Sequence, residues 1–128
     1  MLFFGYAATL AIAGAWGAVA APLDMSLTLG LDAVTVPDDA ETNLLVQYRF
    51  LRAVELGFGV FSLVYWRRIF ELWAFSRVFL SIMAAGVAAR LLSLAVDGTP
   101  SAAMIAFLAW ELVALAVILV YTRATAVR

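Results

Sequence analysis

The sequence predicts an all-α fold in which four antiparallel transmembrane helices form a bundle, with a short strand-like segment in the extracytoplasmic loop between the first two helices. Of the 128 residues, 66% are hydrophobic and 13% are charged, and the mean hydropathy is +1.05. Soluble domains are roughly half apolar and a quarter charged. The apolar residues gather in four stretches of about twenty, the length that a helix needs to cross a hydrocarbon core of about 30 Å. A single transmembrane domain over residues 1–128 is therefore expected.

The first apolar stretch, residues 2–21, contains no charged residue and predicts the first transmembrane helix. The run Ala18-Val19-Ala20 also resembles the cleavage site of a signal peptide, which is the alternative interpretation. No basic segment precedes the stretch, and it is longer than a typical signal-peptide core. We therefore expect this segment to be retained as a helix.

The loop that follows, residues 22–42, contains five acidic residues and no basic residue. Between Leu23 and Leu31, large apolar residues alternate with polar residues or glycine. A period of two is typical of an extended strand. Residues 33–36 are expected to return as a second strand, so that a hairpin covers the mouth of the bundle.

Three further apolar stretches predict the remaining helices, over residues 43–66, 70–96 and 101–121. Only a short turn around Arg67 and Arg68 separates the second from the third, and residues 97–100 separate the third from the fourth. Such short connections place neighbouring helices antiparallel. In the second turn, Thr99 is expected to cap the last helix and Pro100 to occupy its first position.

The arginines near the ends of the predicted helices set the orientation in the membrane. They all fall on the same side of a four-span arrangement: Arg67, Arg68, Arg123 and Arg128. Cytoplasmic loops are enriched in Lys and Arg, so this side is predicted to be cytoplasmic, together with both termini. The acidic loop then lies on the extracytoplasmic side of a bacterial inner membrane.

Six ionisable residues lie inside the predicted spans: Arg49, Arg52, Glu55, Arg77, Arg90 and Glu111. Such residues are costly in a bilayer and face the bundle interior or a hydrated cavity unless they reach the interface. Arg49 and Arg77 lie near enough to the span ends to do so. At a rise of about 1.5 Å per residue, the other four fall near the midplane or in the outer half of the membrane.

Helical spacing places polar residues on one face of the second and third helices. These two stripes are Tyr48, Arg52, Glu55, Gly59 and Ser62, and Met83, Gly86, Arg90, Ser93 and Asp97. Arg52 and Arg90 are each expected to pair with Glu55 or Glu111, because an unpaired arginine there costs roughly 3 kcal/mol or more. The predicted site is one buried cluster of Arg52, Glu55, Arg90 and Glu111, with Tyr48, Arg49, Ser93 and Asp97 as accessory residues.

This cluster allows three interpretations. As a structural network, it fixes the register of the helices. As an outward-open pocket, it binds an anionic or zwitterionic head group through the arginines. As a proton relay, it uses the two glutamates.

Composition argues against most catalytic chemistry. The chain has no cysteine and no histidine, which removes thiolate catalysis, the commonest metal ligand and the usual general base. No hydroxyl nucleophile has a base beside it, and no run of basic residues predicts binding to nucleic acid. We therefore expect no enzymatic activity, no metal and no cofactor.

The chain resembles a family of uncharacterised four-helix bacterial inner-membrane proteins, classed as a domain of unknown function. The resemblance rests on Arg52 followed by Gly57-x-Gly59, on Arg90-Leu-Leu-Ser93 leading into Asp97-Gly98-x-Pro100, and on Glu111-Leu112. It covers nearly the whole chain. The resemblance implies a fold and a compartment but no substrate.

Two functions are expected from these observations. The first is a structural or accessory module of a membrane assembly, in which the small residues Gly5, Ala13 and Gly17 of the first helix contact another copy or a larger complex. The alternative is a binder or carrier of a lipid or small molecule in the Arg/Glu pocket. Four helices are few for a monomeric transporter, so a carrier would have to oligomerise. Membrane lipids are partners in either case.

Overall fold

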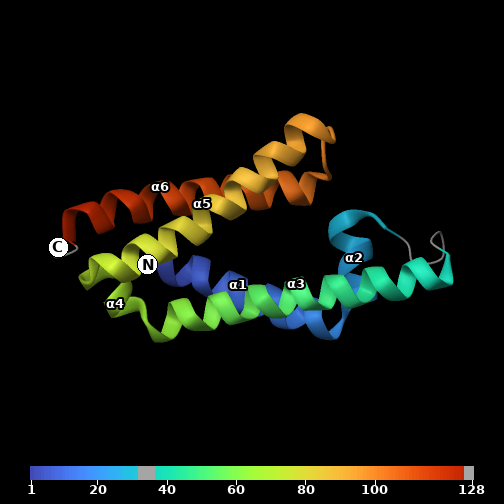
Figure 1. Ribbon diagram of the computed structural model, residues 1–128, viewed down its shortest axis with the longest axis horizontal. Helices are drawn as coiled ribbons and strands as arrows, with labels where there is room; N and C mark the ends of the chain where they lie inside the picture. Colours follow the sequence, from blue (N-terminus) through green and yellow to red (C-terminus); the bar gives the residue numbers. More distant parts are fainter. Residues whose placement is uncertain (32–36, 126–128) are drawn as a thin grey trace.

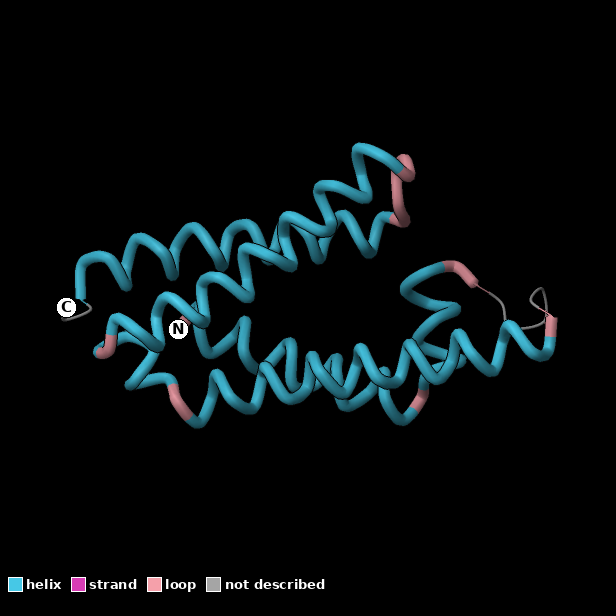
Figure 2. Tube along the Cα trace, in the orientation of Figure 1, coloured by secondary structure: helices cyan, strands magenta, loops and turns pink. Residues whose placement is uncertain are grey.

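The computed structural model describes residues 1–31 and 37–125, and in these residues it forms six helices and no strand (Figures 1 and 2). The helices are α1 (Leu2–Val19), α2 (Ala21–Leu29), α3 (Asp38–Val64), α4 (Trp66–Glu71), α5 (Trp73–Val96) and α6 (Ala102–Thr125). The all-α class is therefore correct. Four long helices are present, but α2 and α4 are two additional short ones.

The four long helices are arranged as two pairs (Figure 1). Helix α1 packs along α3, and α5 packs against α6. The start of α1, the end of α6 and α4 lie at one end of the molecule, whereas α2 and the turn between α5 and α6 lie at the other end. Toward the α2 end the two pairs diverge, as Figure 1 shows.

Two glycines let the backbones of α1 and α3 approach closely. A Cβ atom on Gly59 would lie 2.5 Å from the backbone nitrogen of Ala11, and one on Gly14 would lie 2.6 Å from the carbonyl oxygen of Arg52. Small residues at such contacts replace the hydrophobic driving force that membrane helices lack. The pairing of α1 with α3 therefore depends on these glycines.

Aromatic side chains close the bundle at the α4 end. Phe3 of α1 contacts Phe70 of α4 and Phe79 of α5, with ring centroids 4.9 and 5.6 Å apart. Phe58 of α3 stacks on Phe79 at 5.2 Å. Ile69 of α4 is fully buried in the same core. The core therefore lies at this end, and the α2 end is left less filled.

The predicted strand at Leu23 to Leu31 is wrong, because α2 covers most of it. A proline lies in the first turn of α2, and Gly30 ends the helix in the left-handed conformation with a φ of 67°. Both are common helix boundary signals. In a helix, Ala21 and Met25 lie on the same face, and both are buried against Tyr48 of α3. The predicted return strand at residues 33–36 lies outside the described residues.

The boundaries of α3 and the connection to α5 also differ from the prediction. Helix α3 begins at Asp38 rather than near residue 43, because Pro37 precedes it and acidic residues occupy its first turn. The expected turn at Arg67 and Arg68 is the short helix α4. It is held to α5 by a hydrogen bond that the Ser76 hydroxyl donates to the carbonyl of Ile69.

The start of α6 is capped by Ser101 rather than by Thr99. The Ser101 hydroxyl accepts a hydrogen bond from the backbone N–H of Met104 at 3.4 Å and donates one to the carbonyl of Thr28 at 2.8 Å. Since α6 begins at Ala102, Pro100 precedes the helix and does not occupy its first position. Ser101 thus also ties α6 to the end of α2.

Within residues 1–31 and 37–125, three helices are long and apolar enough to cross a membrane: α1, α5, and α6 over Ala102–Ala124. Helix α3 has 27 residues, which corresponds to about 40 Å, but Arg49, Arg52 and Glu55 interrupt its apolar sequence. The protein is therefore a membrane protein with three clearly apolar helices and a fourth long helix that carries charge.

Candidate functional site

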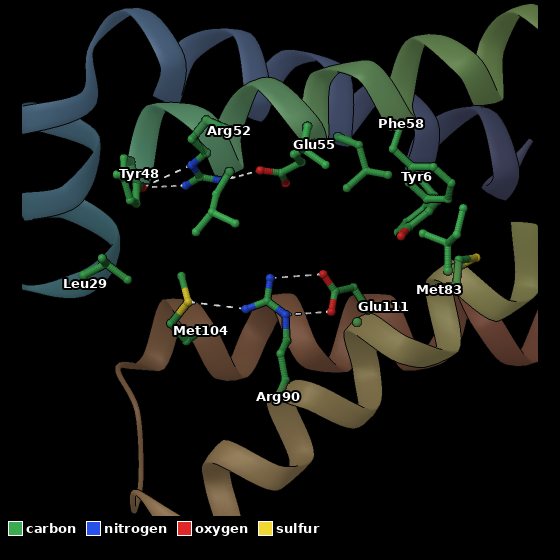
Figure 3. Close-up of a pocket in the computed structure, with 15 residues that line it drawn as sticks. Tyr6, Leu29, Tyr48, Arg52, Glu55, Phe58, Met83, Arg90, Met104 and Glu111 are labelled. Atoms are coloured by element: carbon green, nitrogen blue, oxygen red, sulfur yellow. Dashed lines mark hydrogen bonds and ion pairs between the residues drawn. The ribbon is translucent and has the colours of Figure 1, made fainter. Parts of the chain in front are cut away.

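A cavity of about 390 Å³ lies between the two helix pairs, toward the α2 end (Figure 3). Its volume falls within the range of roughly 300–1,000 Å³ that is typical of ligand pockets. Five helices contribute side chains to its wall, which is mostly apolar. The polar residues that line it are Tyr6, Tyr48, Arg52, Glu55, Arg90 and Glu111.

One wall of the cavity carries a charged group centred on Arg52. Its guanidinium donates to Glu55 at 2.6 Å and forms an ion pair with Asp24 of α2 at 2.7 Å. The Tyr48 hydroxyl donates to Asp24 at 2.6 Å and accepts from two nitrogens of Arg52, at 2.9 and 3.1 Å. This arrangement fixes α2 against α3.

The facing wall carries a second ion pair, between α5 and α6. Arg90 donates through Nε and Nη2 to the two carboxylate oxygens of Glu111, at 2.8 and 3.2 Å. Such two-point pairing of arginine with a carboxylate is geometrically specific. The remaining nitrogen, Nη1, contacts only the sulfur of Met104 at 3.6 Å, a weak acceptor.

The charges thus form two groups that face each other across the cavity, and not one cluster (Figure 3). Each arginine is paired with a glutamate, as the charge balance predicts. Among the described residues, however, no ion pair joins the α3 group to the α5–α6 group. The two helix pairs diverge at this level, which separates residues that the sequence places at similar depth.

The four predicted accessory residues have different positions. Tyr48 is buried and belongs to the Arg52 group. Arg49 is exposed and does not line the cavity. Ser93 donates a hydrogen bond to Asp97 at 2.7 Å at the exposed end of α5, also away from the cavity.

Two residues of the site were not among the predicted ones, Tyr6 and Asp24. Asp24 falls in the segment predicted as a strand, so its position under Tyr48 could not be anticipated. Tyr6 is 4% exposed, and Figure 3 shows its hydroxyl pointing into the cavity. In the described part of the chain this hydroxyl has no hydrogen-bond partner. The hydroxyl is open to the cavity, where it can bond to water or to a guest, and the fully buried atom without a partner in these residues is Nε1 of Trp110.

With Asp24, which does not line the cavity, the two charged groups contain one carboxylate more than guanidinium groups. Asp24, Glu55 and Glu111 carry three negative charges, against two positive charges on Arg52 and Arg90. Glu55 uses one carboxylate oxygen for Arg52, and its other oxygen has no partner among the residues that the structure describes. Within the same residues, no group of three or more Asp or Glu side chains is arranged to hold a metal ion.

The predicted contact of Gly17 with another chain is wrong. A Cβ atom at this position would lie 2.5 Å from both Nε of Arg52 and Oδ2 of Asp24. Gly17 therefore faces the interior of the molecule and leaves room for this ion pair. Helix α1 thus contributes both space and the Tyr6 hydroxyl to the site.

Residues 1–122 match the family model described as a domain of unknown function, DUF4345. The chain belongs to this family. The match confirms the resemblance to an uncharacterised family, and it includes every residue of the two charged groups. No curated protein and no solved structure matches the chain.

Proposed function

We propose that this DUF4345 protein is a non-catalytic, four-span protein of a bacterial inner membrane that binds a small polar molecule or a lipid head group in its central cavity. One observation carries the proposal. A cavity of about 390 Å³ separates two ion-pair groups, and the Tyr6 hydroxyl points into it without a partner in the described residues. A purely structural network would be expected to close this space.

The pairing of charges on α3 supports its assignment as the fourth span. Arg52 and Glu55 face the cavity and satisfy each other, which lowers the cost of placing them in a bilayer. Arg49 is exposed, and its long side chain can extend toward the outer interface. The remaining face of α3 is apolar, with Val46, Phe50 and Val60 exposed for contact with lipid.

The distribution of arginines supports cytoplasmic termini. Arg67 and Arg68 of α4 and Arg123 near the end of α6 lie at the end of the molecule that carries the start of α1 (Figure 1). By the positive-inside rule this end is cytoplasmic. The cavity then lies nearer the extracytoplasmic face, below α2.

The binding proposal is tested by filling the cavity. A Cβ atom on Gly86, which lines the cavity, or on Gly57, which does not, meets no atom within 4 Å. We expect Gly86→Phe to occupy the cavity and Gly57→Phe to extend elsewhere. The measurement is thermal unfolding of the purified protein in an uncharged detergent, with and without dihexanoyl phospholipids carrying glycerol, choline or ethanolamine head groups.

At least one of these lipids is expected to raise the Tm of the wild type and of Gly57→Phe, but not that of Gly86→Phe. If no lipid shifts the wild-type Tm, or if Gly86→Phe responds as the wild type does, the binding proposal is wrong.

A second candidate function, an accessory module within a membrane assembly, is favoured by a shallow groove between α1 and α6. The groove has a volume of about 460 Å³ and is lined by Thr9, Ala103, Ala106, Phe107 and Trp110. Small residues at such a surface allow a further helix to pack closely. If the partner is a second copy, native mass spectrometry should give a dimer for the wild type and a monomer for Ala106→Trp. A monomeric wild type would contradict self-association.

A further inference from the structure

The polar atoms that remain available in the cavity define what it can bind. Two of them accept hydrogen bonds: the second carboxylate oxygen of Glu55 and the hydroxyl of Tyr6, neither of which has a partner in the described residues. Of the guanidinium nitrogens that line the cavity, Nη1 of Arg90 is the one without an oxygen acceptor in the described residues, since it contacts only the sulfur of Met104. Figure 3 shows all three groups facing the same space.

The charged groups that line the cavity favour a zwitterionic guest over an anionic or a cationic one. A guest with only negative charge would bind Arg90 but would leave the second oxygen of Glu55 without a donor. A guest with only positive charge would be attracted by Glu55 but would leave Nη1 of Arg90 without a strong acceptor. A guest that carries both charges satisfies both, and N–H groups on its cationic end match the free oxygens of Glu55 and Tyr6.

The rim of the cavity indicates the side from which the guest enters. Leu51 and Val54 of α3 and Ile82 of α5 line the cavity and are 62%, 54% and 48% exposed, respectively. Helices α3 and α5 meet through Phe58 and Phe79 near the α4 end and then diverge (Figure 1). An apolar rim between two separated membrane helices faces acyl chains rather than water.

Resting on the proposed function, we propose that the guest is a zwitterionic primary-amine amphiphile that enters sideways between α3 and α5. Its ammonium group lies between Glu55 and Tyr6, its anionic group binds Nη1 of Arg90, and its acyl chains leave through the gap beside Leu51 and Ile82. An aminophospholipid of the ethanolamine type has this chemistry. Free phosphoethanolamine has the same head group without the chains, so the test must separate the two sources.

The test is equilibrium binding, measured by native mass spectrometry on the full-length protein in an uncharged detergent. The probes are dihexanoyl phosphatidylethanolamine, phosphatidylcholine and phosphatidylglycerol, and free phosphoethanolamine. We expect the ethanolamine lipid to bind at least ten-fold more tightly than the glycerol lipid, because the latter has no cation. It should also bind more tightly than the choline lipid, whose quaternary ammonium has no N–H donor, and than the free head group, which has no chains.

Two variants locate the ammonium site. Glu55→Gln and Tyr6→Phe should each reduce affinity for the ethanolamine lipid at least five-fold. In Glu55→Gln, Arg52 keeps its ion pair with Asp24 and its hydrogen bond to Tyr48. In Tyr6→Phe, no hydrogen bond of the described residues is lost, so both variants should fold. The matched control is Glu71→Gln, an exposed carboxylate outside the cavity, which should bind as the wild type does.

Different binding results would contradict the proposed function and the assignment of the guest. If none of the four probes binds, the proposed function itself is wrong. If the glycerol or choline lipid binds as tightly as the ethanolamine lipid, or if both cavity variants bind normally, the cavity binds lipid but the primary-amine assignment is wrong. If free phosphoethanolamine binds as tightly as the lipid, the amine assignment stands and the sideways entry of an amphiphile is wrong.

Discussion

Tyr6 and Tyr48 are both buried beside the cavity, yet their hydroxyl groups have opposite roles. The Tyr48 hydroxyl bonds to Asp24, to Arg52 and, at 3.1 Å, to Thr28. The Tyr6 hydroxyl has no partner within the described residues. The first therefore holds the protein together, whereas the second is available to a guest.

This contrast gives a prediction about stability. Tyr48→Phe should lower the free energy of unfolding by about 1–3 kcal/mol, because it leaves the buried Asp24 and Arg52 without one of their partners. Tyr6→Phe should change it by less than about 0.5 kcal/mol, because no internal hydrogen bond is lost. The measurement is denaturant unfolding of both variants in mixed micelles without added lipid. Equal destabilisation of the two would contradict the assignment.

Gly17 offers a second test at the scale of one residue. Gly17→Ala places a methyl group against the Arg52 side chain and the Asp24 carboxylate, so it should lower the free energy of unfolding by about 1–3 kcal/mol. Gly57→Ala is the matched control, since its methyl group meets open space, and it should stabilise α3 by up to about 1 kcal/mol. Thermal unfolding of the two variants checks the difference, and a neutral Gly17→Ala would refute the close approach.

The sequence predicts four charged residues of the site and Tyr48, and it misses Asp24 and Tyr6. Arg52, Glu55, Arg90 and Glu111 stand out because ionisable side chains are rare in apolar stretches. Tyr6 does not stand out, because an aromatic residue in a transmembrane helix is usually a packing residue. Only the three-dimensional structure shows that its hydroxyl reaches the cavity.

At the scale of elements, helix α2 is the segment where sequence patterns conflict. Alternating apolar residues favour a strand, whereas Pro22 and Gly30 favour a helix that begins and ends at these points. The segment forms a helix rather than a strand because the helix buries Met25 and Asp24 against Tyr48. The four long helices, in contrast, are predicted within a few residues, because each coincides with a mostly apolar stretch of about twenty residues.

Ser101 connects α6 to α2 and provides a test at this scale. Ser101→Ala removes both the cap of α6 and the hydrogen bond to the carbonyl of Thr28, so it should cost about 1 kcal/mol and speed hydrogen exchange in α2. Thr99→Ala, which removes the cap expected from the sequence, should have little effect. Faster exchange in Thr99→Ala than in Ser101→Ala would reverse this assignment.

At the scale of the whole molecule, the two helix pairs are joined by aromatic packing at the α4 end and diverge toward α2. The charges lie where the bundle is least filled, so the cavity results from how the helices are arranged. Sequence patterns give the number of long helices and their antiparallel order, but not the divergence of the pairs. That divergence splits the predicted single cluster into two groups.

The proposed orientation can be tested directly because the chain contains no cysteine. Single cysteines are introduced as Glu71→Cys at the α4 end and Thr99→Cys at the opposite end. A membrane-impermeant thiol reagent should label Thr99→Cys in intact cells. It should label Glu71→Cys only after the membrane has been permeabilised. The reverse pattern would place the termini outside.

The space between the two charged groups is an open cavity, and the reactivity of a cysteine placed within it measures how open this space is. Gly86→Cys lines the cavity and Gly57→Cys does not, and neither position is crowded. A charged, water-soluble thiol reagent should modify Gly86→Cys at least ten-fold faster than Gly57→Cys, and bound ethanolamine lipid should slow the reaction at Gly86 alone. Equally slow modification at both positions would show that the two groups form a sealed network and would contradict the account.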